Sequence, residues 1–182
     1  MVGLLDVNVL IARLVPVHEH HALAQRWILD AGARDGWATC PVAELGLIRV
    51  CAQLPVGRRT PEATAEAFVL LRTTSPGHVF WPDVVSPAAL SEVRTAVTAK
   101  QVTDRYLLGL ARHYGGRLIT FDGGLKAAGG EHETPLIESV TAYFTGSNRF
   151  SSSIQCSAMT KPTGVAVCSS AGAEAGAIRQ RP

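Results

Sequence analysis

Four acidic residues stand where strands or helices are predicted to end or begin: Asp6, Glu44, Asp104 and Asp122. Asp6 follows an apolar run at residues 2–5, and Asp122 follows another at residues 118–121. A carboxylate beside a buried strand is costly unless its charge is compensated, and only Asp104 has a basic neighbour in sequence, Arg105. Because Mg²⁺ and Mn²⁺ bind oxygen ligands, the four residues together predict a divalent metal site.

The elements that must position these residues alternate along the chain. Apolar runs predict strands at residues 2–5, 37–39, 79–81, 118–121 and 135–137. Helical periodicity predicts helices at residues 9–14, 20–31, 42–52, 61–72, 88–95 and 104–113. Pro41, Pro61 and Pro87 suit first helical turns, and Thr103 is expected to cap a helix that begins at Asp104.

Strands separated by helices of this length predict an α/β fold with a mostly parallel sheet. Asp6 and Asp122 would then lie at the carboxyl edge of that sheet, where ligands bind in open α/β folds. Glu44 and Asp104 would reach the same edge, because a helix that follows a strand begins at the carboxyl end of that strand. Asn8 and Thr120 are supporting polar neighbours, placed to hold water or to orient a carboxylate.

Four segments carry a resemblance to a known family. They are residues 4–11 (LLDVNVLI), 42–50 (VAELGLIRV), 102–111 (VTDRYLLGLA) and 117–122 (RLITFD). In this order and spacing they resemble the motifs of PIN-domain ribonucleases, specifically the VapC toxins of type II toxin–antitoxin pairs. The resemblance covers residues 1–145 and implies a PIN-like three-layer α/β/α domain there.

The resemblance also implies an activity, Mg²⁺-dependent endonucleolytic cleavage of RNA, with Mn²⁺ as a substitute. Asp6 and Asp104 would be the principal metal ligands, Glu44 a ligand or a base acting through water, and Asp122 an outer ligand for a second ion. Water would attack phosphorus in line, leaving 3′-hydroxyl and 5′-phosphate ends. The implied partners are the RNA substrate and a VapB-type antitoxin that covers the acidic groove, in a homodimer or a toxin–antitoxin hetero-oligomer.

Two other functions stay open at this stage. One is a catalytically idle PIN-fold subunit that binds a partner or RNA. The other is a phosphatase or phosphoacceptor domain in which Asp6 is the nucleophile. Each carboxylate taken alone also has a structural explanation, because Glu44 and Asp104 could complement helix dipoles and Asp122 could belong to a turn.

The charge distribution argues against a strongly basic nucleic-acid-binding domain. The net charge is +2, and the excess of basic over acidic residues lies in residues 146–182. Binding of RNA would therefore require arginines gathered near the acidic residues, drawn from Arg49, Arg58, Arg59, Arg72, Arg105, Arg112 and Arg117.

The remaining features predict little chemistry. Residues 146–182, rich in Ser, Gly, Ala and Thr, are expected to form a disordered tail. His18, His20 and His21 are interpreted as a solvated face. No segment has the length of a membrane span or the form of a signal peptide, so a cytoplasmic location is expected. Zinc and disulfide spacings are absent, so reduced thiols are expected at Cys40, Cys51, Cys156 and Cys168.

Overall fold

A five-stranded parallel sheet forms the centre of the described part of the chain. The computed structural model describes residues 1–123, 125, 137–141 and 143, so the predicted tail at 146–182 lies outside the described residues. The strands are β1 (Gly3–Leu5), β2 (Trp37–Thr39), β3 (His78–Phe80), β4 (Arg117–Thr120) and β5 (Ile137–Ser139). They lie in the order β3-β2-β1-β4-β5, and every pair is parallel. This confirms the predicted α/β class.

The register brings the carboxyl ends of the three inner strands together. Leu5 of β1 pairs with Ile119 of β4, and Leu4 of β1 pairs with Ala38 of β2. The ladder continues one residue further, since the Asp6 amide donates to the Ile119 carbonyl at 2.9 Å. Asp6, Thr39 and Thr120 therefore occupy neighbouring positions at one edge of the sheet.

The helices before β3 start and stop mainly as the sequence predicts. They are α1 (Val7–Leu14), α2 (His21–Trp27), a π-helical turn at Ile28–Gly32, α3 (Ala33–Asp35), α4 (Pro41–Cys51) and α5 (Pro61–Thr74). Proline occupies the first turn of both α4 and α5, and the Thr60 hydroxyl caps α5 by accepting from the Ala63 amide at 3.2 Å. The helix expected at 20–31 runs further, through the π-helical turn to Asp35, and ends at Gly36, whose φ is +89°.

The second half of the chain departs more from the prediction. The helix expected at 88–95 is a 3-10 turn (Pro87–Ala89) followed by α6 (Ser91–Arg94), and β3 begins one residue earlier than expected. The last helix, α7, spans Ala99–His113 rather than starting at Asp104. Its cap is Thr98, which forms a capping box with Gln101. Asp104 thus lies in the second turn of α7, where the N-terminal dipole no longer explains it.

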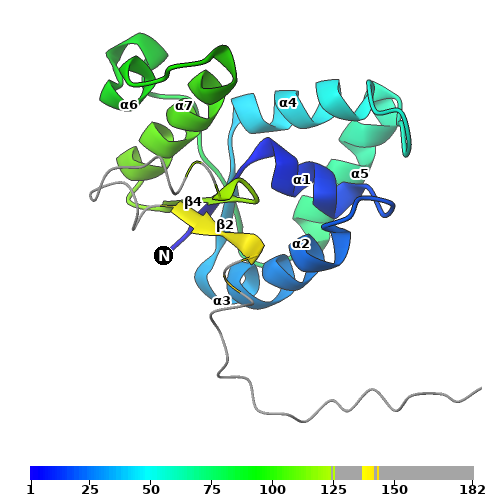
Figure 1. Ribbon diagram of the computed structural model, residues 1–182. Helices are drawn as coiled ribbons and strands as arrows, with labels where there is room; N and C mark the ends of the chain where they lie inside the picture. Colours follow the sequence, from blue (N-terminus) through cyan, green and yellow to red (C-terminus); the bar gives the residue numbers. More distant parts are fainter. Residues whose placement is uncertain (124, 126–136, 142, 144–182) are drawn as a thin grey trace, which may run out of the picture. The chain divides into compact units, whose positions relative to one another are not determined.

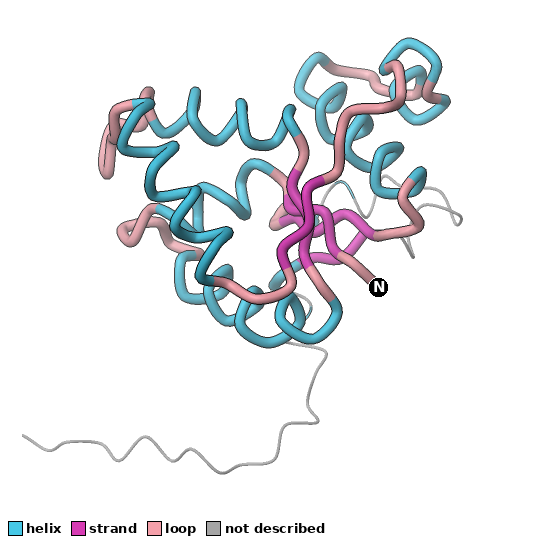
Figure 2. Tube along the Cα trace, turned by 180° about the vertical axis from the view of Figure 1, so that it is seen from behind, coloured by secondary structure: helices cyan, strands magenta, loops and turns pink. Residues whose placement is uncertain are grey.

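The helices divide between the two faces of the sheet (Figures 1 and 2). The chain moves outward from β1 to β2 and β3 through α1–α5, then crosses back to β4 through α6 and α7. Right-handed crossovers in opposite directions place α1–α5 on one face and α6 and α7 on the other. The direction of winding reverses between β1 and β4, and such a switch point is the preferred ligand site of an open α/β sheet.

The core around the sheet is apolar and closely packed. Leu4, Leu5, Leu118 and Ile119 are buried in the strands, and Trp27 of α2 is fully buried against them. Gly116, just before β4, leaves room for the Trp81 ring and the Val2 carbonyl, because a Cβ there would lie 2.4 Å from Trp81 Cη2 and 2.7 Å from the Val2 carbonyl oxygen. None of the helices in the described part of the chain is long and apolar enough to cross a membrane.

Candidate functional site

One threonine hydroxyl links the acidic residues that follow β1 and β4. Thr120 is buried as the last residue of β4, and its hydroxyl donates to Asp6 Oδ2 at 3.0 Å. The same oxygen accepts from the Asp122 amide at 3.0 Å, which fixes the turn that carries Asp122. Asn8, the other predicted supporting residue, donates to Asp6 Oδ2 at 3.5 Å from the first turn of α1. Thr120 thus positions both strand-end aspartates.

Asp6 is a buried carboxylate with a raised pKa. Only 4% of the residue is exposed, and its pKa is raised to about 6. Burial is the largest cause and the charge of Asp104 adds to it, whereas hydrogen bonds from the Thr120 hydroxyl and the amides of Val7 and Asn8 lower the pKa. An Asp6 carboxylate that is ionised at neutral pH therefore pays a desolvation cost that these hydrogen bonds only partly offset.

Asp104 approaches the same edge from the opposite face of the sheet. It is half-buried in the second turn of α7, and it lies close enough to Asp6 for its charge to raise the pKa of Asp6. α7 packs on β1 and β4, which brings residues 98 apart in sequence together. Two carboxylates in one neighbourhood repel each other, and a cation placed between them would relieve that cost.

Glu44 reaches the edge through the end of β2. It lies in the first turn of α4, and its Oε1 accepts from the Thr39 hydroxyl at 2.7 Å. Thr39 is fully buried and is the last residue of β2. The same hydroxyl lies 2.9 Å from His78 Nε2 on β3. Neither Thr39 nor His78 was singled out from the sequence, because their partnership joins residues 39 positions apart.

The four predicted residues are thus placed around the carboxyl ends of β1, β2 and β4, but the side chains do not form a closed ligand set. Among the described residues, no three Asp, Glu, His or Cys side chains lie together closely enough to hold a metal ion. The donor chemistry nevertheless fits a hard divalent cation, because all four side chains offer carboxylate oxygens. The buried Asp6 and the nearby Asp104 bring two carboxylates into one neighbourhood, and such an ion would neutralise their negative charge.

The histidines behave differently from the predicted solvated face. His20 stacks on Phe121, with ring centroids 4.5 Å apart and planes at 29°, so it lies beside the residue that precedes Asp122. His18 Nδ1 accepts from the His20 amide at 3.1 Å, and His21 Nδ1 lies 2.8 Å from the Ala12 carbonyl. All three rings are half-buried. The three rings are thus partly shielded rather than fully solvated, and His20 lies beside the candidate site through its contact with Phe121.

The arginines proposed for RNA binding differ in exposure, and two of them form ion pairs with other residues. Arg105 is buried, with 7% exposed. Arg112 pairs with Glu92, and Arg117 begins β4 at the opposite edge of the sheet, 3.2 Å from Asp35 and 2.9 Å from Glu138. Arg49 and Arg58 are exposed, whereas Arg59 and Arg72 are half-buried. Arg112 and Arg117 are therefore engaged in ion pairs with residues other than the four predicted acids.

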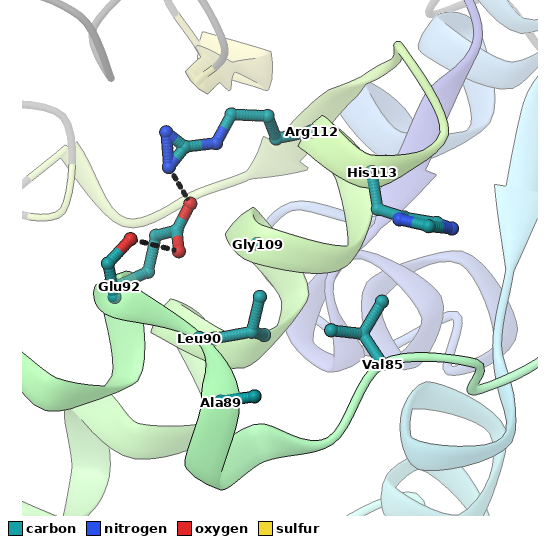
Figure 3. A pocket seen from close by; sticks show the side chains of 8 residues that line it. Val85, Ala89, Leu90, Glu92, Gly109, Arg112 and His113 are labelled. Carbon is teal, nitrogen blue, oxygen red and sulfur yellow. Dashed lines mark hydrogen bonds and ion pairs between the residues drawn. The ribbon is translucent and has the colours of Figure 1, made fainter.

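A hollow of about 270 Å³ between the α6 region and α7 is a separate feature (Figure 3). Its buried Glu92 accepts from the Ser91 hydroxyl at 3.0 Å through Oε2 and pairs with Arg112 through Oε1. Figure 3 shows Arg112 extending from α7 to meet Glu92. Both Glu92 oxygens are engaged, so this carboxylate holds α6 against α7. The hollow contains none of the four predicted site residues.

Comparison with known proteins relates this chain to a family and to two known relatives. The family model described as PIN domain matches residues 3–131. Ribonuclease VapC39 of Mycobacterium tuberculosis is 46% identical over 129 residues, covering 69% of this chain and 91% of the relative. Ribonuclease VapC29 of the same organism is 39% identical over 131 residues, covering 72% and 93%.

A solved structure is similar in fold. The crystal structure of Mycobacterium tuberculosis VapC20, described as a sarcin-ricin loop cleaving toxin, matches with a TM-score of 0.52. The match covers 70% of this chain and 95% of that one, at 17% sequence identity. At this identity the similarity supports the α/β fold described above and carries no information about the RNA that is cut.

Proposed function

Because this chain belongs to the VapC ribonucleases of the PIN-domain family, the toxins of toxin–antitoxin systems, we propose that it is a divalent-metal-dependent endoribonuclease whose site is the carboxyl edge around Asp6. The observation that carries the proposal is the state of Asp6, a buried carboxylate whose pKa is raised to about 6 by burial and by Asp104. Such a carboxylate is stabilised in its charged form by a bound cation.

In this proposal each of the four acidic residues has a role in binding the metal ion or accepting a proton. Asp6 and Asp104 would hold Mg²⁺ or Mn²⁺ as principal ligands, and Asp122 would contribute an outer ligand, its turn fixed by Thr120. When bound, a divalent cation supplies Lewis acidity, which lowers the pKa of water and stabilises charge on the phosphate. Glu44, held by Thr39, would serve as a further ligand or would accept a proton from the attacking water.

The predicted products follow from the attacking group. If water attacks phosphorus in line, the 3′ oxygen leaves, and the fragments carry 3′-hydroxyl and 5′-phosphate ends. Thr120 would contribute by orienting Asp6, and Asn8 by supporting the same carboxylate oxygen. No 2′-hydroxyl nucleophile is needed on this route.

Membership of a toxin family implies an antitoxin as a partner. We expect a VapB-type antitoxin whose C-terminal segment covers the acidic edge and places a basic side chain against the carboxylates, in place of a cation. A homodimer or a toxin–antitoxin hetero-oligomer is the expected assembly. Addition of such an antitoxin should suppress cleavage and should raise the stability of the metal-free toxin by mass action.

The proposal is tested by cleavage of a defined pool of transfer and ribosomal RNA. Purified protein is incubated with Mg²⁺ or Mn²⁺, beside EDTA and beside an Asp6→Asn, Asp104→Asn double variant. Discrete fragments that require the ion and disappear in the variant are the expected result. Equal cutting by the variant would assign the activity to a contaminant, and an inactive wild-type protein would favour the binding subunit. Phosphorylation on Asp6 would favour the phosphoacceptor alternative.

A further inference from the structure

A chain of hydrogen bonds runs from β3 through β2 to Glu44. His78 Nε2 lies 2.9 Å from Thr39 Oγ1, and Thr39 Oγ1 donates to Glu44 Oε1 at 2.7 Å. Thr39 is fully buried, so its hydroxyl depends on these two partners rather than on solvent. Three residues from three different elements are therefore joined at the candidate site.

The direction of the hydrogen bonds follows from proton counting. A threonine hydroxyl has one proton, which here is donated to Glu44, so the contact with His78 requires the ring to donate. His78 must therefore carry its proton on Nε2. Burial, followed by the charge of Arg72, lowers the pKa of His78 and favours the neutral ring, which leaves Nδ1 without a proton.

The ring of His78 is held independently of Glu44. It packs against Trp37 with ring centroids 4.5 Å apart and planes at 55°. Trp37 is fully buried, and its Nε1 donates to the Pro76 carbonyl at 2.9 Å. Trp37 and His78 are also register partners on adjacent strands. These contacts orient the imidazole ring independently of its contact with Thr39.

We propose that His78 is a positioning residue for Glu44, acting through the Thr39 hydroxyl. Because His78 Nε2–H donates to Thr39 Oγ1, the single hydroxyl proton of Thr39 is directed at Glu44 Oε1. This hydrogen bond fixes the rotamer of the Glu44 side chain at the carboxyl edge of the sheet. Each donor also polarises the next one in the chain. This inference rests on the proposed nuclease function, in which Glu44 binds an ion or accepts a proton.

Two substitutions separate hydrogen bonding from packing. His78→Phe keeps an aromatic ring against Trp37 but removes the donor, whereas His78→Gln supplies an amide donor near the position of Nε2. His78→Phe should lower kcat for RNA cleavage roughly 10- to 100-fold, the usual cost of losing an outer partner of a metal ligand, with little change in KM. His78→Gln should retain most of the activity. Equal losses in both variants would overturn the proposal.

A double-variant cycle asks whether His78 acts through Glu44. In a Glu44→Gln background, His78→Phe should produce little additional loss, because the residue that it positions has already been altered. Equal fold-losses in the wild-type and Glu44→Gln backgrounds would contradict the proposal, since they would mean that His78 acts independently of Glu44.

A measurement without RNA keeps the inference separate from the nuclease assignment. Two-bond ¹H–¹⁵N correlation spectra of the full chain without metal should show the Nε2–H tautomer of His78. The side-chain carboxyl ¹³C resonance of Glu44 should move in His78→Phe and remain near its wild-type position in His78→Gln. An Nδ1–H tautomer, or a Glu44 resonance that is unmoved in both variants, would overturn the positioning role. If the spectra agree but the wild-type protein cuts no RNA, the proposed function fails while the positioning of Glu44 stands.

Discussion

The Thr120 hydroxyl donates to Asp6 Oδ2 at 3.0 Å and, through the same oxygen, accepts the Asp122 amide. One buried side chain at the end of β4 thus fixes a carboxylate from β1 and the turn that carries a second carboxylate. We predict that Thr120→Val lowers the cleavage rate roughly 10- to 100-fold, because Asp6 loses its orienting donor. Single-turnover RNA cleavage measures this. Thr120→Ser, which keeps the hydroxyl, is the matched control, and an equally large loss in Thr120→Ser would contradict the explanation.

The raised pKa of Asp6 predicts an unusual pH dependence of stability in the metal-free protein. The folded state binds the Asp6 proton more tightly than the unfolded state, whose pKa is near 3.8, so the stabilisation is fully present below pH 3.8 and is lost as pH rises through about 6. The expected loss from this group is about 3 kcal/mol, from the difference between the two pKa values.

Urea unfolding of wild-type protein and of Asp6→Asn, in EDTA at a series of pH values, measures this contribution. The difference in free energy of unfolding between the two proteins should shift in favour of Asp6→Asn as pH rises from 4 to 7. The reason is that Asp6 becomes charged in the folded wild-type protein over this pH range, whereas the asparagine in the variant stays neutral. A difference that stays constant over this range would show that Asp6 has an ordinary pKa.

The charge of Asp104 should account for part of the rise in the pKa of Asp6. Since the charge of Asp104 raises the pKa of Asp6, Asp104→Asn should lower that pKa, while burial keeps it above the ordinary value. A ¹³C titration of the Asp6 carboxyl in metal-free protein measures the change. Asp83→Asn, at an exposed loop position, is the control and should leave the Asp6 titration where it is. An unchanged Asp6 titration in Asp104→Asn would place Asp104 too far away to share an ion with Asp6.

The pair between Glu92 and Arg112 should matter for folding and not for catalysis. Glu92 is 3% exposed, so Arg112→Met leaves a buried carboxylate that keeps the Ser91 hydroxyl as a donor but loses its cationic partner. The free energy of unfolding should fall by about 1–3 kcal/mol, the usual cost of an unsatisfied buried group. Arg112→Lys, which keeps the charge, should lose less. Cleavage per folded molecule should be unchanged in both variants, and a fall in kcat at full folding would connect this pair to the site.

Removal of residues 147–182 should leave the nuclease intact. The family model matches residues 3–131, and the match to the VapC39 relative covers 91% of that protein's length. Cleavage rates and melting temperatures of full-length and shortened protein provide the comparison. Loss of folding or of activity on shortening would show that the C-terminal segment belongs to the working domain.

The sequence was most informative where local signals and topology agree. The apolar runs before Asp6 and Asp122 predicted two inner strands, and the parallel arrangement then placed both carboxylates at one edge. Pro41 and Pro61 predicted the starts of α4 and α5 for local reasons that the structure confirms. The four segments that resemble PIN-domain ribonucleases predicted the family.

Competing local signals account for the error at α7. Thr103 is a reasonable cap for a helix starting at Asp104, but Thr98 with Gln101 forms a capping box five residues earlier. Residues 99–103 contain no Gly or Pro to prevent the earlier start. Asp104 still reaches the site, because α7 packs across β1 and β4.

The partners of the carboxylates could not be predicted, because they depend on tertiary contacts. His78 meets Thr39 only through the pairing of β2 with β3, and His20 meets Phe121 only because the α1–α2 turn lies beside the end of β4. Neither contact leaves a periodic or spacing signal. The histidines near residue 20 were therefore interpreted from local sequence alone, as residues at a helix start that lack a set of partner carboxylates.

The central claim, that the edge around Asp6 binds a divalent cation, is tested most directly by binding of Mn²⁺. Electron paramagnetic resonance of free Mn²⁺ reports the bound fraction without any RNA. Wild-type protein should bind Mn²⁺, Mg²⁺ should compete, and Asp6→Asn should lose most of the affinity while remaining folded. Binding by Asp6→Asn that equals wild type, or no binding by folded wild-type protein at millimolar ion, would contradict this account of the site.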